Sequence, residues 1–188
     1  MIPIMRYPKE HKAAVKERIV RTAARTLRKR GLGGVGIPAL MKQAGLTHGG
    51  FYGHFKNRGA LVAEAVQWAA AQTAQGVFGE ERSLEETLAA YLSARHLDHP
   101  EEGCVLAALG ADAGRQPARV QGAFAQAAMG FLELTQRKLT PRGHEGPVTD
   151  AALVQAATML GAIILGRLVR DPPLSARILS ACRANLST

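Results

Sequence analysis

Apolar side chains recur at helical spacing along most of this chain. Between residues 9 and 30 neither proline nor glycine interrupts, and the apolar positions fall on one side of a helix; they are Val15, Ile19, Val20, Ala23, Ala24 and Leu27. The glycine-rich segment 31–34 follows, and glycine readily adopts the left-handed conformations that end helices. The pattern therefore predicts one long amphipathic helix over residues 9–30.

Two short helices are predicted next, over residues 37–44 and 48–55, with Gly45 in the turn between them. Pro38 lies in the first turn of helix 37–44, where a backbone N–H would have no hydrogen-bond partner within the helix, so proline is tolerated there. Thr47 is placed to cap the later one through its side-chain oxygen. Three helices with a short glycine-containing turn before the last predict a helix-turn-helix.

The pattern in the remainder of the chain predicts further helices and no strands. Asn57 and the Ser83-to-Glu86 capping box mark two helix starts, and Pro141 to Pro147 form the clearest loop. The predicted helices span residues 58–77, 83–97, 104–113, 117–140, 150–169 and 174–186. We therefore expect an all-α protein of about nine helices in two domains, residues 1–58 and residues 59–188, joined by helix 58–77.

Positive charge is concentrated in the first of these domains. Residues 1–58 contain thirteen Lys and Arg against two Glu, a formal charge of +11, whereas the other residues carry −2 of the total +9. A segment that neutralises phosphates has to concentrate its charge, because each contact releases a counterion from the duplex. The predicted helix-turn-helix is therefore expected to bind double-stranded DNA.

The segment Thr47-His48-Gly49-Gly50-Phe51-Tyr52-Gly53-His54-Phe55-Lys56 resembles the DNA-binding domain of TetR-family bacterial regulators, and the similarity is closest over residues 16–56. Two positions depart from the family pattern. Gly36 stands where a capping Thr or Ser is usual, and Met41 stands where a small alanine is usual. Gly36 is expected to remove a backbone contact to DNA, and Met41 to alter how the two short helices cross.

The resemblance assigns DNA-contacting roles within this segment. Thr47, Tyr52, His54 and Lys56 match positions that bond phosphate and so orient the protein on DNA. His48, Gly49, Gly50 and Gly53 are expected to face the bases. Because only His48 among these offers a side chain that can bond a base edge, direct readout should be sparse and DNA shape should contribute.

Helix 150–169 is apolar nearly all round, so both of its sides are expected to be buried against other protein surfaces. One side can face its own domain, while small residues spaced four apart allow a second copy to approach; a central helix of a monomer is the alternative. The family resemblance implies two-fold dimers through the last two helices. The expected interface residues are Ala157, Gly161, Ile164, Leu165 and Leu168.

A ligand cavity is expected among the helices between residues 83 and 169. Its candidate lining, which would otherwise be plain core, is Tyr91, Leu92, Cys104, Phe124 and Met129. Cys104 begins a predicted helix, which favours a reactive thiol, although Glu101 and Glu102 beside it oppose this. A redox or electrophile sensor acting through Cys104 is therefore one alternative, and a small buried thiol is the other.

Other classes of function find little support. The two cysteines, Cys104 and Cys182, do not form a disulfide framework or a zinc cluster, and the histidines lack metal-ligand spacing. We expect no cofactor, no metal and no enzymatic activity, because no nucleophile–base pair is evident. The first eight residues lack the order of a secretory signal, and the apolar stretch 156–166 is short for a bilayer crossing, so a cytoplasmic protein is expected.

The sequence therefore predicts a DNA-binding transcriptional regulator. It is expected to bind a palindromic operator as a homodimer, most simply as a repressor, and to leave it when a small-molecule effector binds. A DNA-binding protein of the same fold without an effector is the other alternative.

Overall fold

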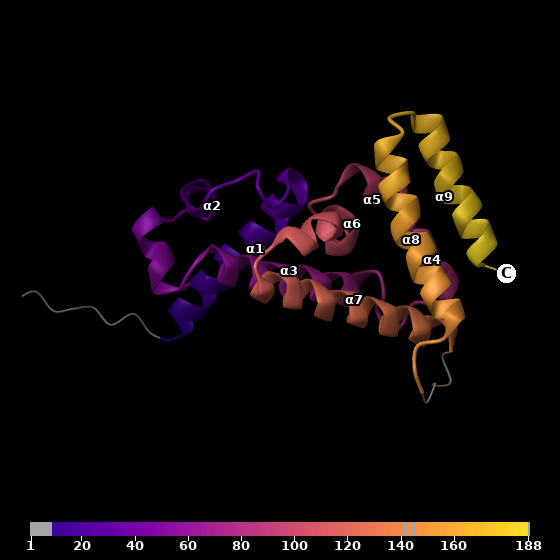
Figure 1. Ribbon diagram of the computed structural model, residues 1–188, viewed down its shortest axis with the longest axis horizontal. Helices are drawn as coiled ribbons and strands as arrows, with labels where there is room; N and C mark the ends of the chain where they lie inside the picture. Colours follow the sequence, from indigo (N-terminus) through magenta and orange to yellow (C-terminus); the bar gives the residue numbers. More distant parts are fainter. Residues whose placement is uncertain (1–8, 141–142, 144–145, 188) are drawn as a thin grey trace, which may run out of the picture.

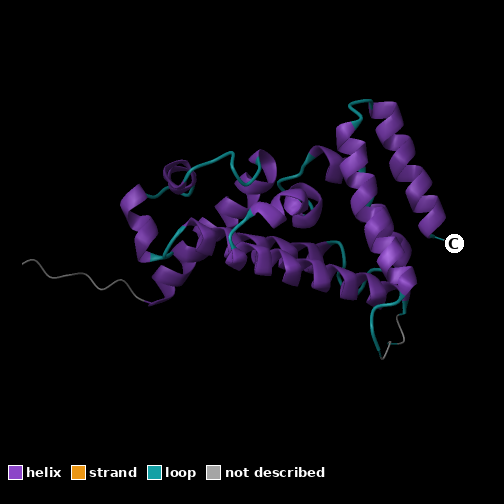
Figure 2. Cartoon of the chain, viewed as in Figure 1, coloured by secondary structure: helices purple, strands orange, loops and turns teal. Residues whose placement is uncertain are grey.

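The computed structural model describes residues 9–140, 143 and 146–187, and all of its regular structure in these ranges is helical (Figures 1 and 2). The α-helices are α1 (Lys9–Arg30), α2 (Ile37–Gln43), α3 (Arg58–Gly76), α4 (Leu84–Tyr91), α5 (Ala94–Asp98), α6 (Val105–Leu109), α7 (Ala118–Leu139), α8 (Asp150–Leu168) and α9 (Pro172–Leu186). Two 3₁₀-helices, η1 (His48–Gly53) and η2 (Gly110–Arg115), complete the described elements. The all-α prediction is confirmed.

Two predicted helix starts are confirmed in detail. The Asn57 side chain accepts a hydrogen bond of 2.9 Å from the Ala60 N–H at the start of α3. At the start of α4, the Glu86 N–H donates to Ser83 and the Ser83 N–H donates to the Glu86 carboxylate. Each capped start satisfies amides that would otherwise have no partner inside the helix.

Three predictions about elements were wrong. The helix expected over residues 83–97 is two helices, because the chain leaves helical geometry at Leu92 and Ser93 caps α5 by accepting from the His96 N–H. The helix expected over residues 104–113 is the short α6 followed by η2. Thr47 makes no capping hydrogen bond, and the segment after it is a 3₁₀-helix with three glycines, a composition that disfavours an α-helix.

The buried side chains form two cores. The first joins α1, α2, η1 and the first half of α3 to α6 and the start of α7, where Val105, Leu109 and Phe124 contribute. The second joins α4, α6, the later part of α7, α8 and α9. The predicted division into domains at residue 58 stays a prediction, since the first core extends across that point.

Figure 1 shows how these elements are arranged. The amino-terminal helices α1 and α2 lie at one end of the molecule, α3 and α7 run side by side through the middle, and α8 and α9 form an antiparallel pair at the other end. The arrangement separates the basic segment from the most apolar helix by the length of the molecule.

Helix α8 is long and apolar enough to pass a length-and-composition test for a membrane span, with 19 residues and a mean hydropathy of 1.7. The core helix of a soluble protein passes the same test, and 39% of the tested window of α8 is buried inside the protein. Ala152, Met159 and Ile163 form part of its buried side.

Candidate functional site

The segment η1 presents one aromatic ring to the core and the next to solvent. Phe51 is fully buried and stacks on Phe55 with ring centroids 5.6 Å apart, whereas the side chain of Tyr52 is 65% exposed. Tyr52 packs edge-on against Phe51 at 5.2 Å and approaches His48 at 6.1 Å. The buried ring thus fixes the backbone, and the side chains that could reach DNA stand on the opposite side.

Seven of the eight predicted DNA-contacting residues are exposed in this segment; they are Thr47, His48, Gly49, Gly50, Tyr52, Gly53 and Lys56. His54 is the exception, because it is partly buried and its Nδ1 atom is buried without a hydrogen-bond partner among the described residues. Burial lowers the pKa of His54, and the charges of Lys12 and Lys16 lower it further. His54 is therefore a neutral imidazole near pH 7 in the free protein, and any bond to phosphate would come from its neutral N–H.

The three glycines of η1 have no structural need to be glycine. A Cβ atom added to Gly49 or Gly53 would meet nothing within 4 Å. At Gly50 it would make ordinary contacts of 3.8 Å with Met41 and Thr47. Because none of the three has a positive φ, neither side-chain packing nor backbone conformation requires glycine at these positions in the free protein.

The two departures from the family pattern lie beside this surface. Gly36 is the N-cap residue of α2 and supplies no side-chain hydrogen bond there. Met41 is fully buried, and its terminal methyl group lies beneath Gly50. The side chain that replaces the usual alanine therefore fills space under the segment that would enter the groove.

The lysine-bearing side of α1 lies against the same region. Lys16 forms an ion pair of 2.7 Å with Glu64 of α3, and its ammonium lies 5.4 Å from the centre of the Phe55 ring. These contacts give Lys16 two partners at the edge of the buried side of α1.

Arg28 differs from the other arginines on its side of α1. Its spacing groups it with the exposed residues Arg18, Arg21 and Arg25, yet it is buried and bonds only carbonyl oxygens, those of Ala24 and Gly103, among the hydrogen bonds of the described residues. Burial lowers the pKa of Arg28 to about 10. The sequence carried no signal for this, because helical spacing cannot show what a distant loop brings to a helix face.

The loop between α5 and α6 ties α1 to the rest of the protein. Glu102 accepts from Arg25 at 3.0 Å and also pairs with Arg95, and Glu101 lies 3.8 Å from Lys29. Together with the bond from Arg28 to Gly103, these contacts attach the second half of α1 to residues 101–103.

His96 links the loop between α5 and α6 to the end of α4 through both of its ring nitrogens. Since the Tyr91 carbonyl can only accept, His96 Nδ1 carries the proton and donates to it at 2.8 Å, so His96 Nε2 accepts from the Cys104 N–H at 3.0 Å. The side chain of Arg167 on α8 donates to the carbonyl oxygens of His96 at 2.5 Å and Leu97 at 3.2 Å. A chain of polar contacts thus runs from α1 through the loop to α8.

Two cavities meet near Cys104. One of about 640 Å³ lies between the end of α3, α4, α5 and the loop, and its lining includes Tyr91, His96 and Cys104. The other, of about 250 Å³, lies between α3 and α7, and the two cavities share Thr73 and Cys104 in their linings. Tyr91 and Cys104 therefore lie where the sequence expected a ligand cavity.

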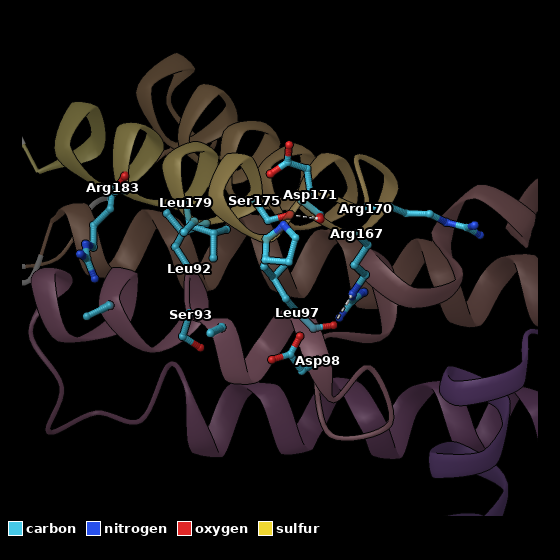
Figure 3. Close-up of a pocket in the computed structure, with 16 residues that line it drawn as sticks. Leu92, Ser93, Leu97, Asp98, Arg167, Arg170, Asp171, Ser175, Leu179 and Arg183 are labelled. Carbon is cyan, nitrogen blue, oxygen red and sulfur yellow. Dashed lines mark hydrogen bonds between the residues drawn. The ribbon is translucent and has the colours of Figure 1, made fainter.

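The other three predicted lining residues lie elsewhere. Leu92 lines another, open groove of about 690 Å³ between α4, α5, α8 and α9, with Arg170 and Arg183 at its opposite ends (Figure 3). Phe124 belongs to the first core. Met129 is 54% exposed on the outer side of α7, because five residues make about 1.4 helical turns and place Met129 about 140° around the helix from Phe124.

One face of α8 is apolar and uncovered. Val154 is 63% exposed and Leu168 is 69% exposed, although both are large hydrophobic residues. The other exposed or half-exposed members of this face are Leu153, Ala157, Gly161, Ile164 and Leu165. All five predicted interface residues therefore lie on one open surface of the helix.

The described residues contain no group of three His, Cys, Asp or Glu side chains placed to hold a metal ion. What the geometry offers is a basic helix-turn-helix at one end and a helical body with cavities and an open apolar face at the other. Such an arrangement is that of a helix-turn-helix DNA-binding protein whose carboxyl-terminal helices pack against its amino-terminal ones.

Comparison with known proteins relates the chain to one family. Residues 19–65 match the family of bacterial regulatory proteins, tetR family, and TetR-family structures share the fold of nearly the whole chain. The amino-terminal segment of the chain therefore matches the DNA-binding domain of TetR-family regulators, and the fold of the whole chain is one that TetR-family structures share. No curated protein matches it.

Several solved structures share the fold. E. coli NemR in its reduced form is 20% identical, with a TM-score of 0.73 over 92% of this chain and 95% of that one. A TetR-family regulator from Cytophaga hutchinsonii is 19% identical, with a TM-score of 0.74 over 93% and 94%. A TetR regulator from Chloroflexus aurantiacus is 23% identical, with a TM-score of 0.71 over 95% and 94%.

Proposed function

We propose that this protein is an effector-responsive repressor that binds a palindromic operator as a homodimer and is released by a small molecule. The observation that carries the proposal is the exposed segment 47–56 in a domain with a formal charge of +11. Thr47, Tyr52, His54 and Lys56 would bond phosphates, while His48 and the glycines would face the bases.

The open face of α8 supports the homodimer. A second copy related by a two-fold axis would cover the exposed leucines and bring two recognition segments to half-sites about one helical turn apart. Ala157 and Gly161, one turn apart on this face, would let the two helices approach closely.

The two cavities support an effector. A DNA-binding protein without one would be expected to have a filled carboxyl-terminal core, and here 640 Å³ and 250 Å³ remain open beside the loop that holds α1. An effector that binds better when the loop is displaced would shift the population away from the DNA-competent arrangement.

Binding to a selected operator and to random duplexes, measured by fluorescence anisotropy at several salt concentrations, tests the proposal. We expect His48→Ala to cost about 1–3 kcal/mol on the operator and to relax specificity at one base pair. Lys56→Ala should weaken binding to all duplexes alike and lower the slope against log salt by about one. Equal losses on operator and random DNA for His48→Ala contradict the assigned roles, and absence of salt-sensitive binding to any duplex overturns the function.

Covalent sensing through Cys104 is a second candidate function, favoured by the place of this thiol between both cavities. Alkylation by iodoacetamide would form a sulfur–carbon bond and expel iodide, with the thiol proton released to solvent. If this function holds, the adduct forms on Cys104 and operator DNA is released, and Cys104→Ser resists while Cys182→Ser responds normally. Retention of operator DNA by the Cys104 adduct excludes the candidate.

A further inference from the structure

Tyr91 is one of the residues that line the larger cavity, and its hydroxyl is fully buried. The hydroxyl has no hydrogen bond of good geometry among the described residues, and the Cys104 thiol is the only side chain there whose hydrogen bonding raises its pKa. Thr87, one turn earlier on the same face of α4, has a second buried hydroxyl, which makes no hydrogen bond among the described residues. A buried hydroxyl without a partner costs stability, so its retention calls for an explanation.

The charges around this hydroxyl are positive. Arg167 is partly buried, bonds the carbonyl oxygens of His96, Leu97 and Ala107, and forms no ion pair among the described residues. Arg28, on the other side of the loop, is likewise buried against carbonyl oxygens. Carbonyl oxygens satisfy the donors of a guanidinium but leave its charge uncompensated.

Both cations act on the lining of the cavity. Burial lowers the pKa of His96 to about 4, and Arg167 and Arg28 each contribute in the same direction. Burial raises the pKa of Tyr91, next the Cys104 thiol raises it, and Arg167 acts in the opposite direction. The phenol therefore keeps its proton at neutral pH and remains a donor.

Glu101 and Glu102 offset the charge of Arg28 in part, but no carboxylate among the described residues does so for Arg167. Glu102 is the only carboxylate in the lining, and it already bonds both Arg25 and Arg95. Arg82 and Arg95 add positive charge to the lining. His96 has both ring nitrogens occupied, so the Tyr91 hydroxyl, which has only the weak Cys104 thiol beside it, keeps a proton that it can donate to a ligand.

We propose that the larger cavity takes a small organic anion, a carboxylate attached to a flat apolar body, whose oxygen accepts a hydrogen bond from Tyr91. The inference rests on the proposed effector function and names the class of its ligand. A volume of about 640 Å³ accommodates a molecule of this kind. Its charge would be stabilised by Arg167 and Arg28 without direct contact, as low-dielectric surroundings strengthen such interactions.

Matched aryl probes test the class of ligand. Benzoate, salicylate and 4-hydroxybenzoate are compared with their neutral amides by calorimetry and thermal unfolding of the full-length protein. We expect the carboxylates to bind at least about tenfold more tightly than the amides, because a charge-assisted hydrogen bond is stronger than a neutral one. Equal or tighter binding of the amides, or no binding of any carboxylate at millimolar concentration, overturns the proposal.

Two variants locate the binding. Tyr91→Phe removes a hydroxyl that has no hydrogen bond of good geometry, so the free protein should be at least as stable as before, while carboxylate affinity should fall about tenfold. Met129→Ala, on the outer side of α7, should leave the affinity unchanged. An unaltered carboxylate affinity in Tyr91→Phe contradicts the assignment. Operator binding is measured separately, without any probe. A protein that binds the operator but no carboxylate contradicts this inference alone, whereas a protein that binds no operator contradicts the proposed function.

Discussion

At the scale of single residues, the glycines of segment 47–56 favour the proposal that its backbone approaches DNA closely. Gly49 and Gly53 are exposed, lack a positive φ, and have room for a methyl group in the free protein. Folding alone would therefore be served better by alanine. Glycine at these positions is consistent with a backbone that lies against the groove floor or the phosphates.

This argument predicts opposite effects on stability and on DNA binding. Gly49→Ala and Gly53→Ala should each raise the free energy of unfolding by about 0.5–1 kcal/mol, because alanine loses less backbone entropy. Both should weaken operator binding, since the added methyl group holds the backbone away from DNA. Urea unfolding and fluorescence anisotropy measure the two quantities. Gly122→Ala on α7, also exposed with nothing within 4 Å, is the control and should change stability only.

His96 gives the protein a pH dependence of known sign. Its pKa is lowered to about 4 in the folded protein from 6.5, so below about pH 6.5 the unfolded chain binds a proton that the folded protein excludes. The stability that neutral His96 contributes is thus present above that pH and is lost as the pH falls toward 4. We expect a loss of about 2 kcal/mol between about pH 7 and about pH 5.

Urea unfolding at the two pH values measures this loss. His96→Gln cannot titrate but can still donate and accept, so its unfolding free energy should depend less on pH. His54, whose pKa is also lowered, contributes in the same direction in both proteins. An identical pH dependence in His96→Gln and the parent protein shows that His96 is not the responsible group.

At the scale of elements, the loop between α5 and α6 depends on a glycine for its close fit. A Cβ atom on Gly103 would lie 2.5 Å from His96 Nε2 and still closer to Cδ2. Gly103→Ala should therefore displace the imidazole and break its bond to the Cys104 N–H, at a cost of about 1–3 kcal/mol. Thermal or urea unfolding measures the cost, and Gly110→Ala, with nothing within 4 Å, should be tolerated.

Elements with strong local signals were predictable, whereas those shaped by their neighbours were not. The extent of α1 and the caps at Asn57 and Ser83 follow from residues adjacent in sequence. The break between α4 and α5 could not be predicted in this way, because the helical spacing of apolar residues continues through it. The 3₁₀ geometry of η1 could not be predicted either, because its sequence pattern indicated an ordinary helix. A local sequence pattern indicates on which face of a helix a residue lies, but not which other segment packs against that face.

At the scale of the whole molecule, the distribution of apolar surface predicts the oligomeric state. Leu165→Glu and Leu168→Glu place carboxylates on the open face of α8, where a second copy would bury them without partners. We expect a monomer by sedimentation and an operator affinity lower by about 100-fold or more, because the two heads no longer bind together.

Met129→Glu is the matched control for this experiment. It also places a carboxylate at an exposed large hydrophobic residue, but on α7 and outside the apolar face of α8. It should sediment as the unaltered protein does and keep its affinity for the operator. A dimer that survives both leucine substitutions places the contact on some other surface.

The sequence by itself determined the class of this protein: an all-helical chain, a charged helix-turn-helix at one end and an apolar helix near the other. These properties depend on side-chain periodicity, capping residues and net charge, which neighbouring residues define. Tertiary structure decided the rest, including the burial of Arg28, the exposure of Met129, and the meeting of Tyr91, His96 and Cys104 around one cavity. Those outcomes depend on contacts between segments far apart in the chain, and helical spacing contains no information about which segments meet.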